Sequence, residues 1–439
     1  MTYKQVAPNP DYFPLLEKVR LAVNENYWQL NAEKNTTESR QLVLAFYRNY
    51  LKSNHIQLDG YTSKELIRKL YNDTHEYSIL TDALKDDTVE GIHVNAWNCI
   101  ILQFRDGHFE HISGFENPEH SIDVIRRLIQ EKGKVLDESM PIAETSIGSN
   151  IRITTVKSPI VDEYVGVACY IRKLSKQVFQ IERYVDGGFA LKQEIDMLST
   201  FMKRGVSVLV VGKVNTGKTT FLSYLLSTLS DTTKVVTIEN SAREMDLTKV
   251  KDGEVVNNVV HMLTRESKIE SLDIKQEDLV VISLRLNPDY ISVAEMRDSE
   301  ASAAVEASRS GHPIISTTHA GSPREAHKRI ADLARKGNHT DYPTALMQAQ
   351  EAFPVVVFLH MLEDNSRRVM GITECFVDEE NKAHYNPLWK FEIEENTVND
   401  NGVVIKGEHR QVGTCSSHLI DKMKMYGISQ AEIDELGGM

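Results

Sequence analysis

The sequence predicts an α/β protein whose central part is a mostly parallel sheet covered by helices on both faces. Two observations lead to this fold class. Between about 191 and 362, short apolar runs alternate with helix-like segments, and continuous apolar strands are typical of a sheet buried on both faces. The first of these runs leads into a glycine-containing loop and then into a helical segment. A helical segment and an α+β module are expected before this core.

The composition is that of an ordinary soluble globular protein. The chain has 439 residues, 41% of them hydrophobic and 26% charged, and this length suggests about three domains. These values exclude a disordered chain, a collagen-like chain and a small disulfide scaffold. The 50 Lys and Arg against 63 Asp and Glu give a net charge of −13. Such a chain repels phosphate backbones on average, so we expect no direct nucleic-acid partner, although a local basic patch could still bind one.

The four cysteines are far apart, and no C-x-x-C motif is present. This spacing excludes a zinc ribbon and argues against a disulfide framework, so we expect reduced thiols in a cytosol. The first residues lack the basic and apolar regions of a secretory signal. The longest apolar runs have the length of a strand rather than of a membrane span. Any work at a membrane is therefore expected on its cytosolic side, through partners.

Residues 1–75 are expected to form a helical N-terminal appendix. Leu15, Val19, Ala22 and Val23 recur at helical spacing, and a second helical pattern covers 39–52. We find no chemistry in this part of the chain and expect an adaptor or packing layer.

The segment 76–182 is expected to be an α+β module with one clear helix that ends at Gly133. The strand-like stretches in it are 93–104, 150–160 and 166–173. A Gly-Gly pair in 183–190 indicates a linker to the core at 191–362. The last part, 363–439, is polar and turn-rich, and we expect a C-terminal extension with one helix near its end.

The strongest motif is the segment from Gly212 to Thr219, which fits G-x-x-x-x-G-K-[ST] completely. Its backbone N–H groups and the following helix N-terminus favour an anionic phosphate. Lys218 is expected to reach the β- and γ-phosphates of a bound nucleotide, and the Thr219 hydroxyl to ligate Mg²⁺. The expected ATP-binding residues are Gly212, Lys213, Val214, Asn215, Thr216, Gly217, Lys218, Thr219 and Thr220.

Two apolar runs in the core end in a carboxylate. Glu295 follows 290–294 and Glu239 follows 235–238. The carboxyl ends of parallel strands line the ligand crevice of such a sheet, so both side chains are candidates for catalysis. Glu295 would hold Mg²⁺ or orient water, and Glu239 is the second candidate for polarising the attacking water. Each could instead be an ordinary surface carboxylate, and the pattern leaves open which one is the principal catalytic group.

A third strand end carries His319, a candidate for sensing the γ-phosphate through a hydrogen bond. Two arginines follow the carboxylates at short spacing. Arg297 would reach a phosphate or pair with Glu300, and Arg243 would face phosphate or solvent. These alternatives stay open at this point.

The glycine loop and the three strand ends at Glu239, Glu295 and His319 follow one another in the chain. In that order they resemble the Walker A, Asp-box, Walker B and His-box motifs of the secretion traffic ATPases. That superfamily powers type II and type IV secretion, type IV pili and archaeal flagella. The segment 123–173 is similar to the cap domain of these enzymes, and the tail after 367 is similar to that of the CpaF-like ATPases of tight-adherence pili and conjugation systems. The resemblance covers about 340 residues. The zinc-binding tetracysteine of type II secretion ATPases is missing, which argues against that branch.

The resemblance implies a RecA-like ATPase core that uses ATP and Mg²⁺ and assembles into a homo-hexamer. Its partners would be secretion or pilus platform proteins of the inner membrane, so the protein would be cytoplasmic and peripheral at that membrane. Arg152 and Arg172, on cap-domain strands, would reach across to the phosphates when the cap closes. The motor would power a type IV secretion, conjugation or pilus machine.

Two other function classes compete with this interpretation. The first is a RecA-like nucleic-acid translocase, whose turnover would be stimulated by nucleic acid with a steep salt dependence. The second is a nucleotide-gated scaffold that binds ATP and hardly hydrolyses it. The acidic composition argues against the first, and the two strand-end carboxylates argue against the second.

Overall fold

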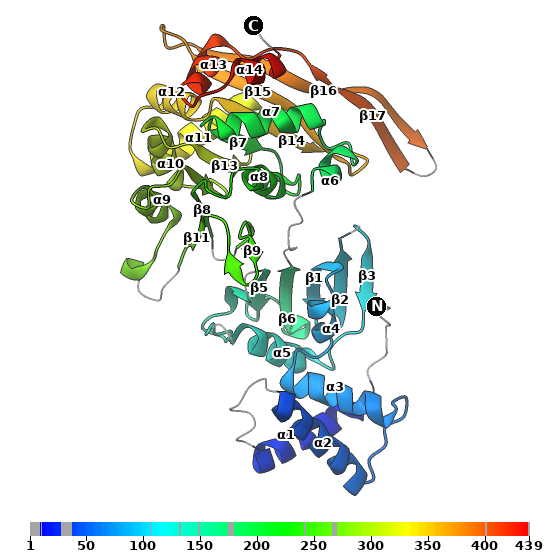
Figure 1. Ribbon diagram of the computed structural model, residues 1–439. Helices are drawn as coiled ribbons and strands as arrows, with labels where there is room; N and C mark the ends of the chain where they lie inside the picture. The colour runs from blue at the N-terminus through cyan, green and yellow to red at the C-terminus, as the bar shows by residue number, and fades with distance from the viewer. Residues whose placement is uncertain are drawn as a thin grey trace. The chain divides into compact units, whose positions relative to one another are not determined.

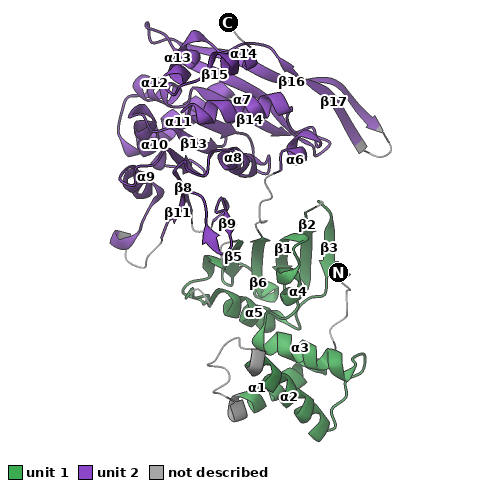
Figure 2. Cartoon of the chain, in the orientation of Figure 1, with its two compact units in different colours: residues 1–175 green, residues 176–439 purple. Residues whose placement is uncertain are grey.

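A computed structural model describes residues 9, 11–27, 37–105, 107–130, 133–147, 150–173, 180–240, 243–265, 270–399 and 402–437. The chain divides into two compact units, 1–175 and 176–439 (Figure 2). None of the described helices is long and apolar enough to span a membrane. The domain boundaries expected from the sequence stay predictions.

Unit 1 begins with a bundle of three helices, α1 (Tyr12–Tyr27), α2 (Thr37–Ser53) and α3 (Ser63–His75) (Figure 1). The expected helical N-terminal segment is therefore confirmed. A capping box formed by Thr62 and Glu65 fixes the start of α3. Tyr12 and Tyr47 are fully buried in the bundle core. The Arg127 guanidinium joins this bundle to the rest of unit 1, because it donates to the carbonyl oxygens at the end of α3.

The second part of unit 1 is a six-stranded antiparallel sheet with helices packed on it, which confirms the expected α+β character. The strand order is β3-β2-β1-β6-β5-β4. The expected strand over 93–104 is in fact a hairpin of two strands that turns at Trp97 and Asn98. The elements are α4 (Leu80–Lys85), β1 (Val89–Ala96), β2 (Cys99–Phe104), β3 (Phe109–Ile112), α5 (Pro118–Gln130), β4 (Ile142–Ile147), β5 (Ile151–Lys157), η1 (Glu163–Val165) and β6 (Val167–Lys173).

Unit 2 is built on a nine-stranded sheet of order β11-β8-β12-β13-β7-β14-β15-β16-β17. The neighbours from β11 to β14 pair in parallel, and those from β14 to β17 pair antiparallel. The core pattern predicts five apolar strands, and each of these runs overlaps a strand of this sheet: 206–212, 234–240, 290–296, 313–319 and 354–360. The strands are β7 (Val208–Val211), β8 (Val235–Glu239), β11 (Val259–Leu263), β12 (Tyr290–Val293), β13 (Ile314–Thr318), β14 (Val355–Met361), β15 (Arg367–Val377), β16 (Ala383–Asn399) and β17 (Gly402–Gln411).

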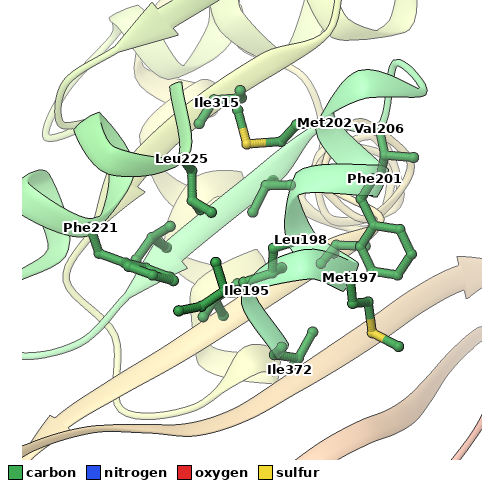
Figure 3. Close-up of a cluster of buried hydrophobic side chains, with 14 of the residues drawn as sticks. Ile195, Met197, Leu198, Phe201, Met202, Val206, Phe221, Leu225, Ile315 and Ile372 are labelled. Carbon is green, nitrogen blue, oxygen red and sulfur yellow. The ribbon is translucent and has the colours of Figure 1, made fainter. Parts of the chain in front are cut away.

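Helices cover both faces of this sheet, as the continuous apolar strands predict. Alternate residues of β7 belong to two separate hydrophobic clusters, Val208 and Val210 to one, Leu209 and Val211 to the other. In Figure 3, Phe201 of α7 and Phe221 of α8 lie in the first cluster. One face carries α7 (Lys192–Lys203), α8 (Lys218–Ser227), α13 (Ser417–Lys424) and α14 (Gln430–Glu435), and the other α9 (Gln276–Leu284), α10 (Glu300–Arg309), α11 (Pro323–Gly337) and α12 (Tyr342–Ala352).

Two segments differ from their sequence pattern. The polar tail contributes β15, β16 and β17, which extend the central sheet beyond β14. The segment 183–190 lies in unit 2, where it starts with the end of α6 (Glu182–Val185) and buries Tyr184 and Phe189 against the core. The remaining short elements of unit 2 are β9 (Val250–Lys251), β10 (Glu254–Val255) and η2 (Glu270–Leu272).

Candidate nucleotide-binding site

The glycine loop connects β7 to α8 at the carboxyl edge of the central sheet. A Cβ atom at Gly212 would lie 2.4 Å from the Leu359 carbonyl oxygen of the neighbouring strand β14, so only glycine fits there. Gly217 caps α8 with a φ of +89°, a left-handed conformation that glycine adopts without strain. The loop therefore presents bare backbone at the positively polarised end of a helix, the arrangement that binds phosphate groups.

Lys218 occupies the first position of α8 and is 7% exposed. Its Nζ donates to the Lys213 carbonyl oxygen at 2.8 Å and lies 3.3 Å from Nδ1 of His319. Burial lowers the pKa of the Lys218 ammonium, and the nearby Glu295 carboxylate opposes this effect. The cation is thus held at the mouth of the loop, where a further negative charge would be favourable.

Glu295, His319 and Lys218 form one chain of contacts. Oε1 of Glu295 lies 2.7 Å from Nε2 of His319, and Nδ1 of His319 lies 3.1 Å from the Gly212 carbonyl oxygen. The guanidinium of Arg297 donates to Oε2 of Glu295 at 2.5 Å, and this contact is the main cause of the raised pKa of Arg297. Oε1 of Glu295 accepts no hydrogen bond from the described residues, so the approach of His319 is an electrostatic contact of the imidazole with the carboxylate. Nδ1 of His319 faces both Nζ of Lys218 and the Gly212 carbonyl oxygen, and its tautomer decides which of the two it hydrogen-bonds.

The strand order explains why these residues meet. Glu295 follows β12 and His319 follows β13, while the glycine loop follows β7. These three strands are parallel and occupy adjacent places in the sheet, so their carboxyl ends lie side by side. The expected convergence of a strand-end carboxylate and a strand-end histidine on the loop is found in the structure. Whether the two side chains act in catalysis stays a prediction.

Glu239 and Arg243 lie farther along the same edge. Two strands, β12 and β13, separate β8 from β7, so Glu239 starts about 14 Å from the loop strand. Glu239 is 1% exposed, and its Oε2 accepts the backbone N–H groups of Glu244 and Met245 at 2.5 and 3.0 Å. Burial, together with the smaller effect of the positive charge of Arg243, lowers the pKa of His261 to about 4. The two hydrogen bonds that Glu239 accepts hold the backbone of Glu244 and Met245, after β8, in place.

The other residues of the loop divide into buried and open positions. Thr216 is 1% exposed, and its hydroxyl donates to the Lys213 carbonyl oxygen at 2.9 Å, which closes the turn. Val214 is exposed, and Asn215 has a left-handed φ of 64°. Thr219 and Thr220 stand half-buried in the first turn of α8. These residues fit ATP and Mg²⁺, because the glycine loop, the Lys218 ammonium and the Thr219 hydroxyl meet at the start of α8.

Two consecutive arginines of β15 join the site, and the sequence pattern gave no signal for them. Nε of Arg367 donates to the Asn215 carbonyl oxygen at 2.8 Å. Arg368 donates to the Gly187 carbonyl oxygen at 3.0 Å and to the Arg367 carbonyl oxygen at 2.9 Å. The C-terminal strands therefore hold both the glycine loop and the Gly-Gly segment that precedes the core.

Arg152 and Arg172 lie in unit 1, directly opposite each other on the neighbouring strands β5 and β6. Both are half-buried. Like charges on directly facing strand positions repel each other. Their role at the glycine loop of unit 2 stays a prediction.

Metal binding by protein groups alone is not indicated. Within the described ranges, no group of three or more His, Cys, Asp or Glu side chains could hold a metal ion. Mg²⁺ commonly keeps several waters and binds through one or two protein oxygens together with substrate phosphates. Thr219 and Glu295 are the side chains that would supply such oxygens here.

The model of the type II/IV secretion system protein family matches residues 73–383, more than half of the chain. The chain is 25% identical over 291 residues to an uncharacterized protein of Methanocaldococcus jannaschii. The matched stretch is 66% of this chain and only 50% of that relative. It is 24% identical over 340 residues to the conjugal transfer protein TrbB of Rhizobium radiobacter, with 76% of this chain and 96% of TrbB covered. Among solved structures, the ATPase DotB of Legionella pneumophila has a TM-score of 0.49 and 18% identity, with 74% of this chain and 84% of DotB covered.

Proposed function

We propose that this chain, which belongs to the type II/IV secretion system protein family, is a motor that hydrolyses ATP to drive a type IV secretion, conjugation or pilus machine. The observation that carries the proposal is the contact chain Glu295–His319–Lys218 at the glycine loop. It combines a phosphate cradle with a carboxylate that can polarise water, and both are required for phosphoryl transfer to water.

The roles follow from the contacts. Lys218 and the N–H groups of the loop would bind the phosphates, and Thr219 with Glu295 would hold Mg²⁺, which neutralises charge when bound. Glu295 would accept a proton from the attacking water and is the principal catalytic carboxylate in this proposal. His319 would report the state of the phosphate end, because it touches both Lys218 and Glu295.

Further cations are needed to neutralise a triphosphate. Arg297 pairs with Glu295 and would orient that carboxylate. Arg152 and Arg172 are proposed to reach the phosphates from the cap, in the same or in a neighbouring subunit. In P-loop enzymes an added arginine is worth roughly 10³ to 10⁵ in rate.

The proposed working form is a homo-hexamer at the cytoplasmic face of the membrane, bound to platform proteins of the machine. The relative TrbB is a conjugal transfer protein by name, which supports a role in conjugation. The movement of unit 1 against unit 2 during the ATP cycle would be the mechanical output.

The test is steady-state ATP hydrolysis by the purified chain, with and without Mg²⁺, across the concentration range in which light scattering detects assembly. We expect Mg²⁺-dependent turnover that rises faster than linearly with protein concentration. Nucleotide binding without turnover in the assembled state would refute the motor and favour a nucleotide-gated scaffold. Turnover that depends on added DNA, with a steep loss at higher salt, would instead identify a nucleic-acid translocase.

A further inference from the structure

The helical bundle of unit 1 contains a groove between α2 and α3 that the proposed ATPase activity does not use. The groove has a cavity volume of about 460 Å³, within the range of ligand pockets. Residues four apart on α2, namely Arg40, Leu44 and Arg48, line one side. Their spacing places them on one face of that helix. The groove thus follows two helix faces over about 12 Å, two turns of a helix.

The floor of the groove is apolar. Leu44 of α2 and Ile67 of α3 are half-buried, and Tyr71 is 7% exposed. The Arg40 guanidinium lies over the Tyr71 ring, 5.2 Å from its centroid, so Leu44 and Ile67 form the open hydrophobic strip between the two helices. The helices are packed through the bundle core below this strip. An occupant with an apolar stripe would therefore bury that stripe here.

The rims of the groove are cationic on both sides. Arg40 and Arg48 are exposed on α2, and Lys64 and Arg68 are exposed on α3. Only Arg68 has a carboxylate partner among the described residues, Asp82 at 2.7 Å. In a chain with a net charge of −13, this concentration of positive charge is local. It would attract an acidic partner to this face and not to the rest of the surface.

We propose that the α2–α3 groove binds an acidic amphipathic helix of a partner protein. The apolar stripe of that helix would lie on Leu44 and Ile67, and its flanking carboxylates would pair with the arginines and the lysine of the rims. A membrane surface fits less well. A helix that lies on a bilayer inserts apolar side chains beyond its charges, whereas here the apolar side chains lie at the floor and the cations at the rim.

The test uses two fluorescent peptides and the full-length protein. The probe peptide is a four-turn helix with Leu at i, i+4, i+7 and i+11 and Glu on both sides of that stripe. In the control peptide, Lys replaces every Glu. Fluorescence anisotropy at low and physiological salt should show at least tenfold tighter binding of the acidic peptide. Equal affinity of the two peptides would overturn the proposal.

Matched variants locate the binding site. Arg48→Glu and Lys64→Glu should each weaken the acidic peptide at least tenfold. Lys52→Glu lies one turn farther along α2, is exposed and does not line the groove, so it should change the affinity less than twofold. Equal losses in Lys52→Glu and Arg48→Glu would show unspecific attraction and refute the groove. Leu44→Ser tests the floor and should also weaken binding, and circular dichroism melting confirms that each variant is folded.

A flotation assay separates the protein partner from a membrane. Vesicles of 30% phosphatidylglycerol and 70% phosphatidylcholine are mixed with the wild type and with Arg48→Glu. Vesicle binding that Arg48→Glu abolishes, without binding of the acidic peptide, would overturn the proposal in favour of an anionic bilayer. Because neither assay measures ATP hydrolysis, failure here is distinguishable from failure of the proposed motor function.

Discussion

Exchanging one carboxylate for an amide tests which strand-end glutamate is catalytic. In Glu295→Gln the side chain keeps its size but loses its charge and one hydrogen-bond acceptor. Oε1 of Glu295 lies 2.7 Å from Nε2 of His319, so the amide would remove the negative charge beside the imidazole, which in turn contacts Lys218. Loss of a general base typically costs 10² to 10⁴ in rate, about 2.7–5.5 kcal/mol of transition-state stabilisation.

The control is Glu239→Gln. The Glu239 carboxylate is 1% exposed and accepts two backbone N–H groups, so its replacement should destabilise unit 2 by about 1.5–3 kcal/mol, the value of a hydrogen bond to a charged group. Thermal melting and kcat are measured on both variants. We expect Glu295→Gln to lose turnover with little change in Tm, and Glu239→Gln to lower Tm with a smaller loss of turnover. The reverse pattern would refute our assignment of Glu295.

The remaining predictions concern other parts of the chain. Lys218→Ala should reduce ATP hydrolysis at least about 10²-fold with the fold intact, and wild-type turnover would contradict a phosphate-binding loop. Arg367→Ala frees the Asn215 carbonyl, so ATP affinity measured with a fluorescent analogue should fall several-fold, whereas an unchanged Kd would show that the contact is dispensable. Burial lowers the pKa of His327 to about 4, so the folded state disfavours the charged imidazole. The neutral imidazole therefore contributes to the free energy of unfolding above about pH 6.5, and this stability is lost as the pH falls toward 4. Urea unfolding should therefore lose up to about 1.4 kcal/mol per pH unit from this group, and His327→Gln should show a shallower slope. Arg152→Ala and Arg172→Ala should slow hydrolysis up to about 10³-fold without changing the melting of unit 2, and full activity in both would remove the cap arginines from the mechanism.

The core strands could be predicted because each is a short apolar run between helical patterns. β7 is buried on both faces, so all of its positions are apolar, and this apolar run is visible in the sequence. The loop after it was equally predictable, since its glycines meet backbone constraints that no other residue satisfies, such as the close approach at Gly212.

The C-terminal strands could not be predicted from their sequence. β16 carries the acidic cluster Glu392, Glu394 and Glu395, so its pattern is that of an exposed loop. These side chains are exposed because the antiparallel end of the sheet has an open face, and their strand conformation depends on pairing with β15 and β17. The contact from Arg367 to the glycine loop follows from that pairing and therefore had no local signal.

The hairpin of β1 and β2 was hidden for a different reason. Its turn consists of Trp97 and Asn98, without the Gly or Pro that normally indicates a tight turn. Gly114 supplies the missing space from elsewhere in the chain, because a Cβ atom there would lie 2.6 Å from Cα of Asn98. A long-range contact thus replaces the local turn signal.

The choice between Glu295 and Glu239 shows where local pattern ends and topology begins. Both side chains end an apolar strand, and both are expected at the carboxyl edge of the same sheet. Only the strand order distinguishes them: β13 alone separates β12 from the loop strand β7, whereas both β12 and β13 separate β8 from it. That order is set by crossover connections through helices on both faces, which no short stretch of sequence encodes. His319 follows β13, the strand between β12 and β7, so its side chain contacts Glu295 on one side and Lys218 on the other. Glu239 follows β8, which lies one strand farther away, beyond β12.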